Sequence, residues 1–177
     1  LLKHLYKNST DKNLKKYLLN YYMDSFRATL FRQTQFAEFE QLAHAKAEAG
    51  EALTKDSLNE TYYALNKQYY GDGIVHDEQI AYEWARIPHF YNPFYVYQYA
   101  TGFSAAIALS GKILKEGTDA VEDYKKFLKG GSSAYPIELL RIAGVDMESP
   151  KPVEAALQVF ATYLNELENL ISKKHWL

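Results

Sequence analysis

Apolar residues recur along this chain at the three- and four-residue spacing of an α-helix, and this periodicity constrains the fold more than any other feature. The clearest stripe, whose consecutive members lie four or three positions apart, consists of Val153, Leu157, Phe160, Leu164, Leu167 and Ile171. No segment alternates apolar and polar residues in the manner of a half-buried strand. The sequence therefore predicts an all-α protein without a β-sheet.

Glycine and proline divide the chain into helices joined by short connections. Residues 12–49 contain neither, which predicts one long helix or two nearly collinear helices stopped by Gly50. Six later helices are expected, each written here from its opening to its closing residue. They run from Thr54 to Gly71, from Asp77 to Arg86, from Asn92 to Gly117, from Thr118 to Gly130, from Tyr135 to Gly144, and from Ser149 through the apolar stripe that ends at Ile171. We predict a multi-helix array of about eight helices that forms a single domain over residues 1–177. The opening residues read as the middle of a helix, so we expect the chain to be cut from a longer protein.

Composition excludes several classes of protein. The chain has 20 Lys and Arg against 22 Asp and Glu, and a net charge of −2 excludes a broad basic surface for nucleic acid. Cysteine is absent, which excludes disulfide scaffolds, cysteine-bound zinc and thiol chemistry and fits a cytoplasmic location. No run reaches the roughly 18 apolar residues of a membrane span. Neither nucleic acid nor a membrane is expected as a partner.

One loop stands out as a candidate site. His89 lies between Pro88 and Pro93, which reduce the freedom of the loop and hold the imidazole in place. The chain is rich in tyrosine, and Tyr95 and Tyr99, four positions apart, are expected to project from one face of the helix that follows. Two phenols and an imidazole could form a hydrogen-bonding wall that binds a peptide carbonyl or a developing oxyanion.

Glycine at position 102 follows on the same face, and a glycine inside a helix costs roughly 1 kcal/mol relative to alanine. Close approach of another backbone or of a ligand at Gly102 would explain it. The structural alternative is a tyrosine-rich core helix whose small residues only let helices pack closely. Segment 31–40, in which aromatic residues alternate with Arg, Gln and Glu, is expected to lie between neighbouring elements with its polar groups paired inside.

The remaining histidines carry no metal-binding pattern. His4, His44, His76 and His175 are expected to be ordinary surface residues. None of the five histidines has the H-E-x-x-H spacing of a zinc helix. We therefore expect this chain alone to bind no catalytic metal.

Several of these segments resemble signatures of oligoendopeptidase F. They are residues 31–40, 69–71, 84–91, 94–102 and 143–147, and the resemblance extends over nearly the whole chain. Oligoendopeptidase F belongs to the thimet-oligopeptidase-like zinc metallopeptidases. The resemblance implies a helical, cytoplasmic enzyme that cuts short peptides inside a deep channel.

The resemblance also implies an active site divided between two parts of one polypeptide. In the family, an H-E-x-x-H helix and a later Glu hold the zinc, and both precede the region that this chain resembles. The zinc of the intact enzyme would then be bound outside this chain, which would supply the C-terminal wall of the catalytic cleft. Carried onto this sequence, contacts with the scissile carbonyl and the oxyanion are assigned to His89, Tyr95 and Tyr99. Tyr91 and Tyr97 are their alternatives and, with Gly102, the residues assigned to substrate binding.

Two alternative functions, neither of them catalytic, stay open for this chain. The chain could be a non-catalytic helical module that binds a peptide or a partner helix in a tyrosine-lined groove. It could also be a purely structural domain that only closes the channel.

Overall fold

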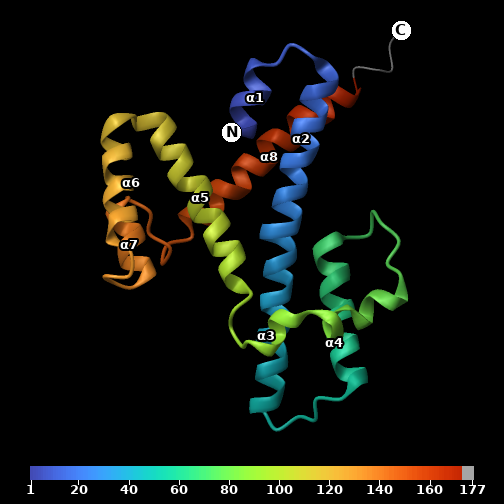
Figure 1. Ribbon diagram of the computed structural model, residues 1–177. Helices are drawn as coiled ribbons and strands as arrows, with labels where there is room; N and C mark the ends of the chain where they lie inside the picture. The colour runs from blue at the N-terminus through green and yellow to red at the C-terminus, as the bar shows by residue number, and fades with distance from the viewer. Residues whose placement is uncertain (173–177) are drawn as a thin grey trace. The chain divides into compact units, whose positions relative to one another are not determined.

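The computed structural model describes residues 1–172, and these residues are helical and contain no strand (Figure 1). The α-helices are α1 (Leu2–Asn8), α2 (Lys12–Phe26), α3 (Arg32–Glu48), α4 (Lys55–Tyr70), α5 (Tyr97–Glu116), α6 (Thr118–Gly130), α7 (Pro136–Ile142) and α8 (Lys151–Ser172). A π-helical turn, η1 (Arg27–Phe31), joins α2 to α3, and two 3-10 helices, η2 (Glu78–Arg86) and η3 (Pro88–Tyr91), precede α5. The all-α fold class with about eight helices is confirmed.

Most helix ends lie where glycine and capping residues predict them. Gly50, just beyond α3, has a φ of +79°, a left-handed conformation that favours glycine. Thr54 caps α4, because its hydroxyl accepts a hydrogen bond from the Ser57 N–H at 3.2 Å while the Ser57 hydroxyl accepts one from the Thr54 N–H at 3.1 Å. Gly144, with a φ of +79°, follows the end of α7.

The predicted start of the helix that ends at Gly117 is wrong. That helix, α5, begins at Tyr97 and not at Asn92–Pro93. Phe94 has a φ of +58°, and a right-handed helix cannot pass through a residue in that conformation. Tyr95 therefore precedes the helix. Smaller differences are that the predicted helix over 78–86 is a 3-10 helix and that Thr118 is the first residue of α6, with Gly117 at the cap position.

The chain divides into two compact units. The central unit is Ala28–Ala100, and the terminal unit consists of Leu1–Arg27 together with the described residues from Thr101 onward. The prediction that residues 1–177 form a single domain is not tested by this division, and it stays a prediction.

The terminal unit is built around aromatic side chains where α8 packs against α2 (Figure 1). Phe26 is fully buried, and its ring meets Phe103 edge-on with centroids 4.9 Å apart. Tyr163 of α8 packs against Tyr6 and Tyr22 at centroid distances of 6.0 and 5.4 Å. Burial and a hydrogen bond with the neighbouring Glu166 carboxylate raise the pKa of Tyr6 to about 12.

The buried face of α8 differs from the apolar stripe in its sequence. The buried residues are Pro152, Ala156 and Tyr163, each one position before a member of the stripe. Leu157 and Ile171 of the stripe are 39 % and 54 % exposed. The other members of the stripe, Val153, Phe160, Leu164 and Leu167, are partly buried, and Phe160 packs against Phe26 at a centroid distance of 5.6 Å.

The central unit has its own core between α3 and α4, which lie side by side (Figure 1). Its buried residues are Phe36, Phe39, Tyr62, Leu65, Ile87 and Val96. Gln35 and Glu40 on α3 are also buried, at 1 % and 7 % exposure. Segment 31–40 thus lies among neighbouring elements with polar groups inside, as predicted, but these groups are not all paired: among the described residues, Gln33 Oε1 and Gln35 Nε2 are buried without a hydrogen-bond partner.

Candidate functional site

The loop that carries His89 is fixed to the core of the central unit on both sides. Ile87, two positions before His89, is 6 % exposed. Phe90, the next residue, packs against Phe36 and Phe39 at centroid distances of 5.7 and 5.3 Å. Because Ile87 and Phe90 are both anchored in the core, their packing holds the imidazole of His89 in place.

The structure brings His89, Tyr95 and Tyr99 together. His89 Nε2 lies 3.0 Å from Tyr99 Oη, and Tyr99 Oη lies 3.4 Å from Tyr95 Oη. The imidazole stacks on the Tyr95 ring with centroids 5.7 Å apart and an interplanar angle of 10°. The Tyr99 ring meets both of the other rings edge-on, at 5.4 and 5.6 Å. We call these three side chains the His–Tyr cluster.

The Tyr99 hydroxyl donates to Tyr95 Oη. Because this hydroxyl has a single hydrogen, the tautomer of His89 that fits the cluster is the one with Nε2–H, which donates to Tyr99 Oη. The hydrogen bond with Tyr95, together with burial, raises the pKa of Tyr99, so Tyr99 stays protonated at neutral pH. The hydroxyl hydrogen of Tyr95, whose residue is 40 % exposed, is then available to an acceptor outside the cluster.

The other residues assigned to substrate contact lie outside this cluster. Tyr91 and Tyr97 belong to the same unit and are 83 % and 49 % exposed. Gly102 belongs to the terminal unit, and a Cβ at that position would meet no heavy atom within 4 Å among the described residues. The close approach expected at Gly102 is therefore not found in the part of the chain that the structure describes.

The other histidines have varied surroundings. His76 closes the end of α4, with its ring nitrogens 2.9 Å from Asn66 Oδ1 and 2.7 Å from the Gly71 carbonyl. His44 packs on the ring of Phe94 at a centroid distance of 4.7 Å. His4 lies on the exposed surface of α1, and His175 lies outside the described residues.

Two carboxylates lie next to this loop: Glu40, which belongs to segment 31–40 and is buried, and Glu83, a partly buried residue that sequence analysis missed. Glu40 on α3 accepts a hydrogen bond from the Phe94 N–H at 2.8 Å. Glu83 on η2 accepts hydrogen bonds from Arg32 at 2.5 Å, from the Tyr62 hydroxyl at 2.6 Å, and from Arg86. The signal available in the sequence was the presence of these acidic residues within stretches dominated by aromatic side chains.

Glu83 is ionised despite its burial. Burial raises the pKa of its carboxyl, but the hydrogen bond from Tyr62 and the positive charge of Arg32 outweigh that effect and hold the pKa below its ordinary value. Burial, together with the hydrogen bond to this carboxylate, raises the pKa of Tyr62 far above its usual range. Glu83 therefore acts as an anionic centre that ties η2 to α3 and α4.

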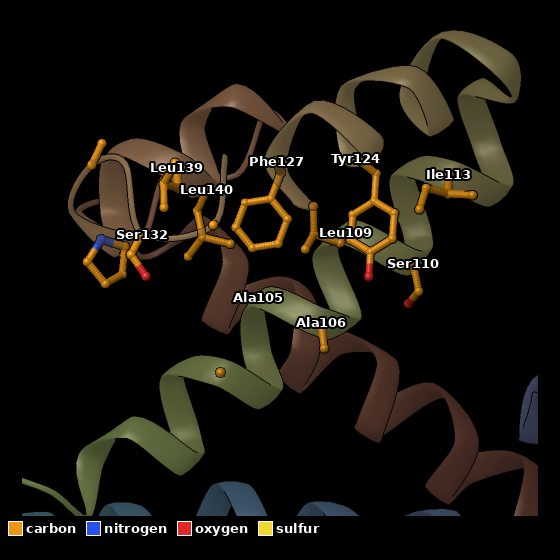
Figure 2. Close-up of a pocket in the computed structure, with 14 residues that line it drawn as sticks. Ala105, Ala106, Leu109, Ser110, Ile113, Tyr124, Phe127, Ser132, Leu139 and Leu140 are labelled. Atoms are coloured by element: carbon orange, nitrogen blue, oxygen red, sulfur yellow. The ribbon is translucent and has the colours of Figure 1, made fainter. Parts of the chain in front are cut away.

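The terminal unit contains a separate apolar groove of about 710 Å³ between α5, α6 and α7 (Figure 2). In Figure 2, Leu109 and Ile113 of α5 lie near Tyr124 and Phe127 of α6, and Leu140 of α7 lies beside Phe127. Tyr124 is its only tyrosine, so this groove is not the tyrosine-lined one that a binding module would use.

No metal centre is present within residues 1–172, because no three His, Asp or Glu side chains there lie close enough together to hold a metal ion. The residues present therefore do not form a zinc site. Among the same residues, no helix combines the length and the apolar character needed to cross a membrane.

Comparisons with known proteins place the chain in a family. Residues 1–159 match the model of peptidase family M3. The oligopeptidase PepF of Bacillus subtilis is 56 % identical over 170 residues, covering 96 % of this chain and 25 % of that protein. A plasmid-encoded oligoendopeptidase F of Lactococcus lactis subsp. cremoris is 50 % identical over 173 residues, covering 98 % of this chain and 29 % of that protein. 

A solved structure agrees with these sequence matches. The crystal structure of oligoendopeptidase-F from Enterococcus faecium matches with a TM-score of 0.95 and 47 % identity, over 98 % of this chain and 33 % of that one. The chain spans between a quarter and a third of the length of these three relatives.

Proposed function

Because the chain belongs to peptidase family M3, we propose that it forms the C-terminal part of a cytoplasmic zinc metalloendopeptidase that hydrolyses short peptides. The resemblance to oligoendopeptidase F is confirmed by relatives of that name that align with nearly the whole chain. Residues 1–172 contain no metal-binding set, so the zinc ligands of the intact enzyme would lie in the remainder of the polypeptide. The partners proposed are a short peptide substrate and that remainder.

The chain's own contribution is proposed to be hydrogen bonding to the substrate carbonyl. The observation that carries this role is the series of contacts from His89 Nε2 to Tyr99 Oη at 3.0 Å and from Tyr99 Oη to Tyr95 Oη at 3.4 Å. Such a series polarises its last hydroxyl, which makes Tyr95 a stronger donor than an isolated phenol. When the carbonyl becomes a tetrahedral oxyanion, the bond from Tyr95 strengthens, and this difference lowers the barrier.

The exposed rings of Tyr91 and Tyr97 are proposed to contact the peptide beside the scissile bond. Large rings with few rotatable bonds bury much apolar area at low entropic cost. Their exposure of 83 % and 49 % leaves this area available to a ligand.

The experiment is kinetic and uses the intact enzyme. Tyr95→Phe removes one hydroxyl and keeps the ring, so packing in the His–Tyr cluster should hardly change. Loss of one oxyanion donor lowers kcat by about 100-fold, and KM should move little because the loss falls on the transition state. Tyr82→Phe, which alters a half-exposed tyrosine of the same unit, serves as the control and should keep its kcat. If Tyr95→Phe retains its zinc and its full kcat, Tyr95 is not the donor.

A further inference from the structure

The carboxylate of Glu40 meets the backbone at the point where the His89 loop turns toward α5. Glu40 lies on α3 and is 7 % exposed, and its Oε1 accepts the Phe94 N–H at 2.8 Å. Phe94 is the one non-glycine residue within residues 1–172 that has a positive φ, at +58°. The residue after it is Tyr95, the last donor of the His–Tyr cluster.

No ion pair explains the burial of Glu40 within residues 1–172. The nearest acidic neighbour on α3, Glu38, accepts a hydrogen bond from the Tyr69 hydroxyl at 2.7 Å. A buried carboxylate needs hydrogen bonds to offset the loss of water. The bond from the Phe94 N–H supplies one, so burial of Glu40 and the conformation of Phe94 are linked.

Phe94 is held from one face of α3. His44 lies four positions after Glu40 and therefore on the same face, and its ring packs on the Phe94 ring at 4.7 Å. Glu40 thus fixes the backbone of Phe94 while His44 contacts its side chain. Phenylalanine has no intrinsic preference for a left-handed conformation, so this conformation is imposed by its surroundings.

We propose that Glu40 is a positioning residue for catalysis: by holding Phe94 in its left-handed conformation, it places the Tyr95 hydroxyl at the end of the His–Tyr cluster. This inference rests on the proposed role of Tyr95 as an oxyanion donor. A return of Phe94 to negative φ would turn the following peptide and carry Tyr95 away from Tyr99. Glu40 would then affect the rate without touching the substrate.

The test compares two substitutions that both remove the charge of Glu40. Glu40→Gln keeps the shape and an acceptor oxygen, whereas Glu40→Met keeps the approximate volume and has no acceptor. In the intact enzyme, Glu40→Met should lower kcat by about 10-fold with little change in KM, because the left-handed state of an unrestrained phenylalanine is a minor one. Glu40→Gln should stay within about threefold of the unmodified enzyme. Zinc content and circular dichroism of both variants should match the unmodified enzyme.

A second substitution tests the link through Phe94. Glycine adopts positive and negative φ about equally, so adding Phe94→Gly to Glu40→Met should restore kcat to within about threefold. If Glu40→Met alone does not fold, the double variant is compared directly with the unmodified enzyme. Equal loss of kcat in Glu40→Met and Glu40→Gln, or no recovery with Phe94→Gly, would overturn the inference.

The Tyr95→Phe background separates this inference from the proposed function. If Glu40 acts through the Tyr95 hydroxyl, Glu40→Met should reduce kcat by less than about twofold once that hydroxyl is gone. A further 10-fold loss in that background would show that Glu40 acts by another route. If Tyr95→Phe alone keeps full kcat, the proposed function fails and the inference fails with it. If Tyr95→Phe is impaired while Glu40→Met is not, only the inference fails.

Discussion

Substitution of Glu83 by Gln should loosen the segment that carries His89. Glu83 is the anionic centre of η2, its side chain is 9 % exposed, and it accepts hydrogen bonds from Arg32, Tyr62 and Arg86. Glutamine keeps the size of the side chain and one acceptor oxygen but removes the charge. The change therefore isolates the electrostatic part of the link between η2 and the helices α3 and α4.

The magnitude follows from the exposure of each partner. Arg86 is 69 % exposed, and an ion pair with an exposed partner contributes about 0–1 kcal/mol. Arg32 is 28 % exposed, and a hydrogen bond between charged groups at such a site contributes about 1.5–3 kcal/mol. Tyr62 can still donate to the glutamine oxygen, so most of that bond remains. A loss of about 2–3 kcal/mol is expected, which corresponds to a rise of about 30- to 150-fold in the opening equilibrium.

Hydrogen exchange of peptides from residues 78–91 in the intact enzyme measures this opening directly. Glu122→Gln is the matched control, because Glu122 pairs with Lys125 at 2.8 Å on an exposed face of α6 and should change exchange only slightly. Exchange in 78–91 that stays within about threefold after Glu83→Gln would refute the reasoning.

The effect should also depend on pH in a defined direction. The pKa of Glu83 is lower in the folded chain than in the unfolded chain, so its stabilisation is complete above the unfolded value, about 4.3, and is lost as the pH falls through the folded value. After correction for intrinsic exchange, the difference between Glu83→Gln and the unmodified enzyme should shrink below about pH 4. A difference that grows toward acid would contradict the direction of this pKa shift.

Two further outcomes are expected. The 177-residue chain alone, after dialysis, should contain no stoichiometric zinc and should not hydrolyse peptides; one tightly bound zinc, or turnover abolished by His89→Ala, would show a complete site within it. In urea unfolding, Gly50→Ala should lower the free energy of unfolding by about 1–2 kcal/mol, because Gly50 has a φ of +79°. Gly111→Ala, inside α5 with open space around its Cβ, should raise that free energy by about 1 kcal/mol. A change of the same sign in both variants would contradict the backbone explanation.

Helix ends could be predicted where the signal is local. Gly50, Gly71 and Gly144 follow helix ends with a positive φ, which glycine adopts without strain. A glycine after a helical stretch is visible in the local sequence, so these ends can be predicted. The start of α5 could not be predicted, because the positive φ of Phe94 goes with a hydrogen bond from its N–H to Glu40, a residue 54 positions away. The stripe from Val153 to Ile171 predicts the helix α8 but not its fully buried residues, which are Pro152, Ala156 and Tyr163, since apolar side chains alone do not reveal which neighbours a helix has.

The structure brings His89, Tyr95 and Tyr99 together, although through a local structure other than the one predicted, and their roles stay a prediction. Tyr95 and Tyr99 come together although Tyr95 is not part of α5. Hydrogen bonds of the 3-10 type, from Gln98 N to the Tyr95 carbonyl at 3.2 Å and from Tyr99 N to the Val96 carbonyl at 3.3 Å, make one tight turn before the helix. Spacing of four positions across such a turn also brings the two rings into contact.

The rigidity of this site derives from α3 and α4 and not from the loop itself. The segment from His76 to Phe94 contains only short 3-10 helices, whose own hydrogen bonds are weak and few. Its side chains and backbone are instead tied to the two helices by buried or half-buried polar pairs. These pairs are Asn66–His76, Tyr62–Glu83, Asn59–Trp84 and Glu40–Phe94, with separations between 2.6 and 2.9 Å. Because every helical partner lies outside the loop, substitutions on α3 and α4 should alter the geometry of His89 and Tyr95 without removing any group that meets the peptide.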